Sequence, residues 1–200
     1  MTDINLREVN HSDENLLFNW RNIDELVALS YHQKKVTRSE HRLWLSKSLD
    51  SRDIELTIIQ LGEKDIGSIR LVGSELGSRV SIYLIPGNEG KGYGFKALSL
   101  ALNQSQLGSC FYANIQLNNI PSQKLFIKLG FEEISRDNEF IYNRYISKSL
   151  AAINSRSKLN NNEFLYHSII YYLIHNWSKV PTDKTNKTNK TNKTNKTNKT

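Results

Sequence analysis

Apolar and polar residues alternate along several short segments in the first three quarters of the chain. This period of two is typical of strands with one buried side. A four-residue link, "GEKD", joins two of these segments and is too short for a crossover, so it predicts an antiparallel hairpin. The predicted strands cover residues 4–9, 54–61, 66–73, 79–85, 109–117 and 139–147.

Other segments carry apolar residues at helical spacing. Ser12 is a candidate N-cap for the first, and Thr37 with Glu40 has the spacing of a capping box before another. The predicted helices cover residues 13–22, 41–49, 95–104 and 121–130. Helices and strands in this mixed order predict an α+β, or mixed α/β, domain over residues 1–148.

Two further segments follow the predicted domain. Residues 149–180 contain "EFLYHSIIYYLIHNW", which is apolar around most of a helix of about 15 residues and too short to span a bilayer. We expect it to pack on the domain or on a second subunit, as in a homodimer; an interfacial membrane helix is the alternative. Residues 181–200 are a Lys-Thr-Asn repeat without apolar residues, which predicts disorder.

The net charge of +7 belongs mostly to this repeat. Six lysines and one aspartate from Asp183 onward contribute +5 of it, so the remainder is close to neutral and we expect no nucleic-acid partner. A single cysteine fits a reducing compartment. The first ten residues lack the pattern of a signal peptide, and we therefore expect a cytoplasmic protein without a transmembrane segment.

A glycine-rich stretch, "PGNEGKGYG", lies between the strand predicted at 79–85 and the helix predicted at 95–104. The first turn of a helix offers unpaired N–H groups, and glycines let an anion approach them closely. The stretch therefore predicts a phosphate site at a helix N-terminus, with Lys91 adding charge. It fits neither the P-loop nor the dinucleotide fingerprint. A turn without a ligand is the alternative.

A second motif, "NNIPSQKLFIKLGF", follows about 25 residues later. Together the two motifs resemble those of the GNAT N-acetyltransferases, whose acetyl-CoA loop is often "RGKGYG" and whose next helix often reads "N-x-x-S-x-x-L-Y-x-K-L-G-F". The resemblance covers about residues 5–147. It implies a central mixed, mostly antiparallel sheet flanked by helices, with acetyl-CoA as co-substrate and no metal. The cofactor-binding residues it implies are Leu84, Ile85, Glu89, Gly90, Lys91, Gly92, Tyr93, Gly94, Asn119, Ser122 and Lys128.

Two residues depart from the family pattern. Glu89 stands where the family has Gln or Arg, which puts a carboxylate beside the expected pyrophosphate. Phe126 stands where the family usually has a tyrosine that protonates the departing thiolate. Phenylalanine cannot donate a proton, so water or another hydroxyl would have to substitute.

The resemblance implies direct attack of a neutral amine on the thioester, with a backbone N–H near Leu84 and Ile85 stabilising the carbonyl oxygen. The predicted catalytic residues are His41, Glu55 and Asn119. His41 and Glu55 are candidates for the base; a packing role for His41 and a solvated strand carboxylate for Glu55 are the alternatives.

The N-terminal half resembles a GNAT subgroup that acetylates nucleotide-linked amino sugars in surface-glycan pathways. The match rests on "WRN" and on Thr37, His41 and Trp44. It implies that the acceptor site contains Trp20, Arg21, Asn22 and His41. Core packing is the alternative for the tryptophans and a surface salt bridge for Arg21.

Three functions follow from these patterns. The first is acetylation of a small-molecule amine, a nucleotide-linked amino sugar. The second is acetylation of a protein amino group, such as a ribosomal N-terminus. The third is a non-catalytic acyl-CoA-binding module, which Glu89 and Phe126 would suit.

Overall fold

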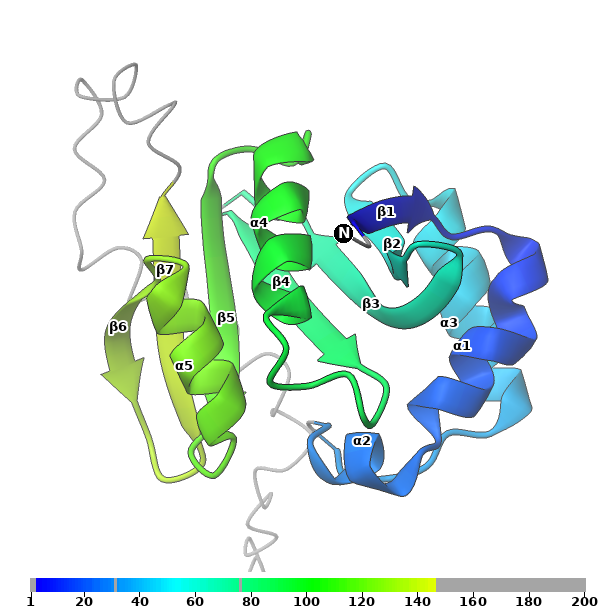
Figure 1. Ribbon diagram of the computed structural model, residues 1–200, viewed down its shortest axis with the longest axis horizontal. Helices are drawn as coiled ribbons and strands as arrows, with labels where there is room; N and C mark the ends of the chain where they lie inside the picture. Colours follow the sequence, from blue (N-terminus) through cyan, green and yellow to red (C-terminus); the bar gives the residue numbers. More distant parts are fainter. Residues whose placement is uncertain (1–2, 31, 76, 147–200) are drawn as a thin grey trace, which may run out of the picture.

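The computed structural model describes residues 3–30, 32–75 and 77–146. In this part of the chain seven strands form one sheet in the order β1-β2-β3-β4-β5-β7-β6 (Figure 1). The strands are β1 (Ile4–Glu8), β2 (Ile54–Leu61), β3 (Lys64–Val72), β4 (Ser78–Leu84), β5 (Cys110–Gln116), β6 (Glu132–Arg136) and β7 (Phe140–Ile146). The helices are the 3₁₀ turn η1 (His11–Asp13), α1 (Glu14–Arg21), α2 (Asp24–Ala28), α3 (Arg38–Asp50), α4 (Tyr93–Gln104) and α5 (Ile120–Lys128).

Five of the six neighbouring strand pairs are antiparallel, and β4 with β5 is the parallel pair. A parallel pair needs a crossover, and α4 supplies it between β4 and β5. The predicted mixed, mostly antiparallel sheet flanked by helices is therefore confirmed.

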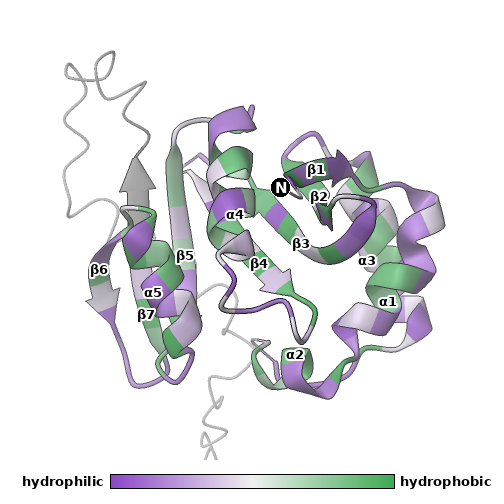
Figure 2. Cartoon of the chain, viewed as in Figure 1, coloured by the Kyte–Doolittle hydropathy of each residue, from purple (hydrophilic) through white to green (hydrophobic). Residues whose placement is uncertain are grey.

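Two apolar clusters lie in the fold. The larger joins the central strands to α4 and α5 through side chains such as Ile69, Leu98, Phe111 and Phe126. The smaller, which includes Leu45, packs α1 and α3 against β2. Figure 1 shows α4 and α5 over the sheet, with α1 and α3 beside its β1 end and α2 below the end of β4. The helices carry both hydrophilic and hydrophobic residues in Figure 2, as expected for elements with one buried side.

Helix starts follow local hydrogen bonding, and one predicted cap was wrong. Asn10, not Ser12, caps the first helical turn, because its side chain accepts from the Ser12 N–H. The capping box of Thr37 and Glu40 is present at α3. The strand β6 and the helix α2, five residues each, were not predicted, because neither is long enough to show a period.

No helix among the described residues is long and apolar enough to cross a membrane. The last described strand ends at Ile146. The segments predicted at 149–180 and 181–200 lie outside the described residues.

Candidate active site

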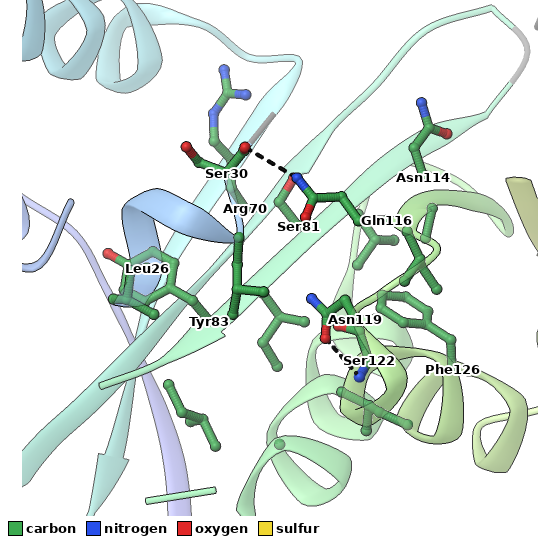
Figure 3. Close-up of a pocket in the computed structure, with 18 of the residues that line it drawn as sticks. Leu26, Ser30, Arg70, Ser81, Tyr83, Asn114, Gln116, Asn119, Ser122 and Phe126 are labelled. Atoms are coloured by element: carbon green, nitrogen blue, oxygen red, sulfur yellow. Dashed lines mark hydrogen bonds between the residues drawn. The ribbon is translucent and has the colours of Figure 1, made fainter. Parts of the chain in front are cut away.

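The parallel strands β4 and β5 separate after a short contact. Ser78 pairs with Phe111 and Arg79 with Tyr112, and these two pairs are the whole register. Towards their carboxyl ends at Leu84 and Gln116 the strands are no longer paired with each other. A cavity of about 1620 Å³ is lined by residues from this split, from α4 and α5 and from the N-terminal helices (Figure 3).

The two faces of β4 look into different halves of the cavity. Val80, Ile82 and Leu84 pack with the cluster around α4 and α5. Tyr83 packs with the cluster of α1 and α3, on the opposite face. Because side chains alternate along a strand, the split connects a glycine-loop half, beside α4 and α5, with a second half beside α1 to α3.

The glycine loop between β4 and α4 has the shape of an anion cradle. Gly87, Gly90 and Gly92 all have positive φ, between 73° and 87°. An added Cβ at any of the three would meet nothing within 4 Å, so the space beside the backbone is open. Gly92 is the N-cap of α4 and supplies no side chain to its first N–H groups. These groups are available to an anion such as a pyrophosphate.

Both charged side chains of the loop fold back onto Gly87. Glu89 accepts a hydrogen bond from the Gly87 N–H at 2.8 Å, and the Lys91 ammonium donates to the Gly87 carbonyl at 2.6 Å. The carboxylate at position 89 therefore shapes the loop. This contact explains how the loop accommodates an acid where the family pattern has Gln or Arg.

Helix α5 closes the same half of the cavity. Asn119 caps the helix, accepting from the Ser122 N–H at 3.1 Å, and both residues line the cavity. Lys128 also lines it, with its ammonium 4.7 Å from the ring centroid of Phe95. Phe126 is 3% exposed and packs edge-on against Phe131.

The backbone N–H of Leu84, at the end of β4, faces the split. The Ile85 N–H donates to the Ile66 carbonyl at 2.9 Å, so it is already used inside the sheet. In an antiparallel pair the N–H groups alternate in direction, so Leu84, next in line, points its N–H away from β3 and towards β5. Leu84 and Ile85 were both predicted to stabilise a carbonyl oxygen. The N–H of Leu84 points in a suitable direction and the N–H of Ile85 does not.

The half of the cavity beside α1 to α3 contains two basic side chains, the buried His41 and the partly buried Arg21. His41 is 3% exposed, lies against Phe18 and Trp44, and neither ring nitrogen has a protein partner among the described residues. Burial lowers the pKa of His41, and the positive charges of Arg38 and Arg21 lower it further against the opposing effect of Glu14. The imidazole is therefore neutral at pH 7 and can accept a proton.

Arg21 lies in the same half. Its Nη1 is buried without a protein partner in the described part of the chain, and no described carboxylate pairs with it. Burial lowers the pKa of Arg21, although a guanidinium stays charged at pH 7. Arg70 also lines the cavity, with its guanidinium 5.7 Å from the ring centroid of Trp44.

Comparison with known proteins gives this geometry a family. The model of the acetyltransferase (GNAT) domain matches residues 3–132, well over half of the chain. The chain belongs to the GNAT acetyltransferase family. The predicted fold and the predicted class of enzyme are thereby confirmed.

Solved structures support the GNAT fold. A domain from Methanocaldococcus jannaschii DSM 2661 is 27% identical, with a TM-score of 0.64, and the match covers 74% of this chain and all of that one. Aminoglycoside acetyltransferase AAC(6')-Ib in complex with coenzyme A is 18% identical, with a TM-score of 0.62 and coverage of 76% and 100%. Spermidine N-acetyltransferase from Vibrio cholerae, in complex with CoA and spermine, is 17% identical, with a TM-score of 0.61 and coverage of 74% and 98%. No curated protein matches the chain.

Five of the predicted GNAT site residues do not line the cavity, namely Ile85 and Lys91, described above, and Glu55, Trp20 and Asn22. Glu55 does not line the cavity; its carboxylate accepts from the Gln106 N–H at 2.7 Å, beyond the end of α4, so it is unsuited to act as the base. Trp20 is buried in the core, edge-on to Tyr83. Asn22 bonds the backbone of Val36 through both ends of its amide and so holds the segment before α3.

Sequence reasoning missed many of the GNAT cavity residues, among them Arg70, Tyr83 and Gln116. All three lie on predicted strands, at positions where a single sequence does not show which face meets the cavity. A polar residue inside an apolar strand was the available signal for Arg70 and Gln116. Burial raises the pKa of Tyr83, so its phenol is protonated at neutral pH.

Proposed function

We propose that this GNAT protein uses acetyl-CoA to acetylate the amino group of a nucleotide-linked amino sugar. The observation that carries the proposal is Arg21, which lines the cavity with its Nη1 buried and without an acidic partner among the described residues. Arginine binds phosphate groups through paired hydrogen bonds, so it suits the diphosphate of a sugar nucleotide.

The glycine loop fits the acetyl donor. Gly90, Gly92 and Gly94 would hold the pyrophosphate at the N-terminus of α4, and Asn119 and Ser122 would line the path of the thioester arm. Bound acetyl-CoA supplies an activated acetyl group. These residues bind and orient it.

The split supplies the groups for transfer. The Leu84 N–H donates to the thioester carbonyl oxygen, where negative charge develops as the amine attacks. Neutral His41 takes the proton that the amine loses, directly or through water. Phe126 donates no proton, so the CoA thiolate leaves unprotonated or takes a proton from water; thiol pKa values near 8.5 allow this.

The charges of the acceptor half favour an anionic acceptor. Two of the structures named above were solved with coenzyme A or with CoA and spermine, and one of them is named for aminoglycosides, which are also polyamines. Here Arg21 lines the cavity without a described acidic partner, whereas the carboxylate of Glu40 is engaged by Thr37 in its capping box. Like charges raise the cost of binding a polycation.

The test compares a nucleotide-linked amino sugar with the same sugar lacking the nucleotide. In Arg21→Gln we expect kcat/KM to fall at least about tenfold for the linked sugar and less than about twofold for the free sugar. Arg38→Gln is the matched control. This substitution also removes one positive charge beside His41, but Arg38 does not line the cavity. An equal fall for both sugars in Arg21→Gln would contradict the assignment.

Acetylation of a protein amino group is the alternative acceptor class. Turnover with a peptide N-terminus and with none of the amino sugars would favour it.

A further inference from the structure

Gln116 joins the two sides of the cavity. It is the last residue of β5, it lines the cavity and it is 8% exposed. Its Nε2 donates a hydrogen bond of 3.2 Å to the carbonyl of Ser30, which follows α2 in the N-terminal part of the chain. Figure 3 shows this bond reaching across from β5 to Ser30.

This bond fixes the direction of the amide. A carbonyl can only accept, so the amide group on Ser30 must be the NH₂ end. The other end, Oε1, is therefore turned away from Ser30. It is buried and has no hydrogen-bond partner among the described residues. A buried acceptor without a partner costs free energy unless a bound group donates to it.

The register of β4 and β5 places the Oε1 of Gln116 beside the proposed site of acetyl transfer. Ser78 lies level with Phe111 and Arg79 with Tyr112. The same register continued along both strands brings Gln116 level with Tyr83, one residue before Leu84. Gln116 and Tyr83 also share the sheet face that looks towards α1 to α3, since Ile115 and Leu84 both pack on the other face. An amine that approaches a carbonyl held by the Leu84 N–H from this face meets Gln116.

We propose that Gln116 orients the acceptor amine: Oε1 accepts a hydrogen bond from the N–H of the attacking amine, while Nε2 holds the segment at Ser30 over the site. Such a bond directs the nitrogen lone pair towards the thioester carbonyl, and the amide oxygen does not take the proton of the amine. The inference rests on acetyl transfer to an amine and is independent of the nucleotide proposed above.

The first test is Gln116→Leu, which removes both polar atoms at similar volume. With the best amine acceptor of the wild type, kcat/KM for the amine should fall at least about tenfold while KM for acetyl-CoA changes less than about twofold. Gln123→Leu is the matched control. Gln123 also donates its amide to a backbone carbonyl, that of Leu117 at 2.8 Å, but it does not line the cavity. Equal kinetics for the two variants would overturn the proposal.

In Gln116→Glu the pH dependence of kcat distinguishes the proposed role from a purely structural one, which would leave it unchanged. A carboxylate beside the amine stabilises the ammonium form, so the pH of half-maximal kcat should rise, whereas Gln123→Glu should leave it unchanged. An unshifted profile in Gln116→Glu contradicts the inference.

A measurement without any amine separates this inference from the choice of acceptor. In slow hydrolysis of acetyl-CoA, water takes the place of the amine and donates to the same oxygen. Gln116→Leu should slow this hydrolysis at least about fivefold, and Gln123→Leu should not. Hydrolysis at the wild-type rate in Gln116→Leu would overturn the role of Gln116 whatever the natural acceptor is.

Discussion

The chemistry proposed for this enzyme depends on a few buried polar groups in an apolar setting. His41 lies between Phe18 and Trp44, with no protein partner for either ring nitrogen in the described part of the chain. Burial keeps it neutral and therefore able to accept a proton. The sequence predicted His41 because a histidine stood at helical spacing beside Trp44. Its neutrality could not be predicted, since that depends on Phe18 and Arg21 from another helix.

The lowered pKa of His41 has a consequence for stability. The folded state resists protonation of this ring, whereas the unfolded chain protonates it near pH 6.5. The contribution of His41 to the free energy of unfolding is therefore fully present above about pH 6.5. It is lost as the pH falls below about 6.5 and through the folded pKa. In His41→Gln the loss of unfolding free energy between pH 7.5 and pH 5 should be smaller than in the wild type.

Urea unfolding at the two pH values measures this difference. His11→Gln is the control, because His11 is exposed on the 3₁₀ turn. A wild-type pH dependence in His41→Gln would mean that folding does not lower the pKa of this ring, which would contradict its burial as a neutral imidazole.

At the scale of elements, helices and strands with strong apolar periodicity could be predicted from the sequence. The separation of β4 from β5 could not. The hairpin of β2 and β3 and the helices α3, α4 and α5 follow from apolar spacing, caps and turn residues. The separation of β4 from β5 leaves no local signal, because the alternating pattern of a strand does not show where its pairing with a neighbouring strand ends. Only the glycine loop after β4 indicated a binding site there.

The loop assignment has a direct test in Gly92→Asp. Gly92 begins α4 at φ 80°, and an aspartate there would place negative charge where the pyrophosphate is proposed to bind. Acetyl-CoA affinity measured by calorimetry should fall at least about tenfold, equivalent to about 1.4 kcal/mol. Unchanged affinity would refute the assignment.

Gly108→Asp is the control for backbone strain. Gly108 also has positive φ, at 99°, and open space beside it, but it lies in the loop between α4 and β5 and does not line the cavity. Both variants should lose similar stability, while only Gly92→Asp should lose acetyl-CoA affinity.

At the scale of the whole molecule, the fold assembles an acceptor site from distant parts of the chain. Arg21 comes from α1, Arg70 from β3 and Gln116 from the end of β5. The sequence predicted Arg21 by resemblance to one GNAT subgroup, but it could not show that Arg70 shares its cavity. The guanidinium of Arg21, which has no described acidic partner, would repel a polycation and attract a diphosphate in this half of the site.

This charge makes the choice of acceptor the most direct test of the account. The measurement is kcat/KM of the unmodified enzyme with acetyl-CoA for nucleotide-linked amino sugars, and for spermine and an aminoglycoside under the same conditions. We predict that at least one nucleotide-linked amino sugar exceeds both polyamines by at least about tenfold, a difference of about 1.4 kcal/mol in transition-state binding. A preference for either polyamine of that size would contradict the account.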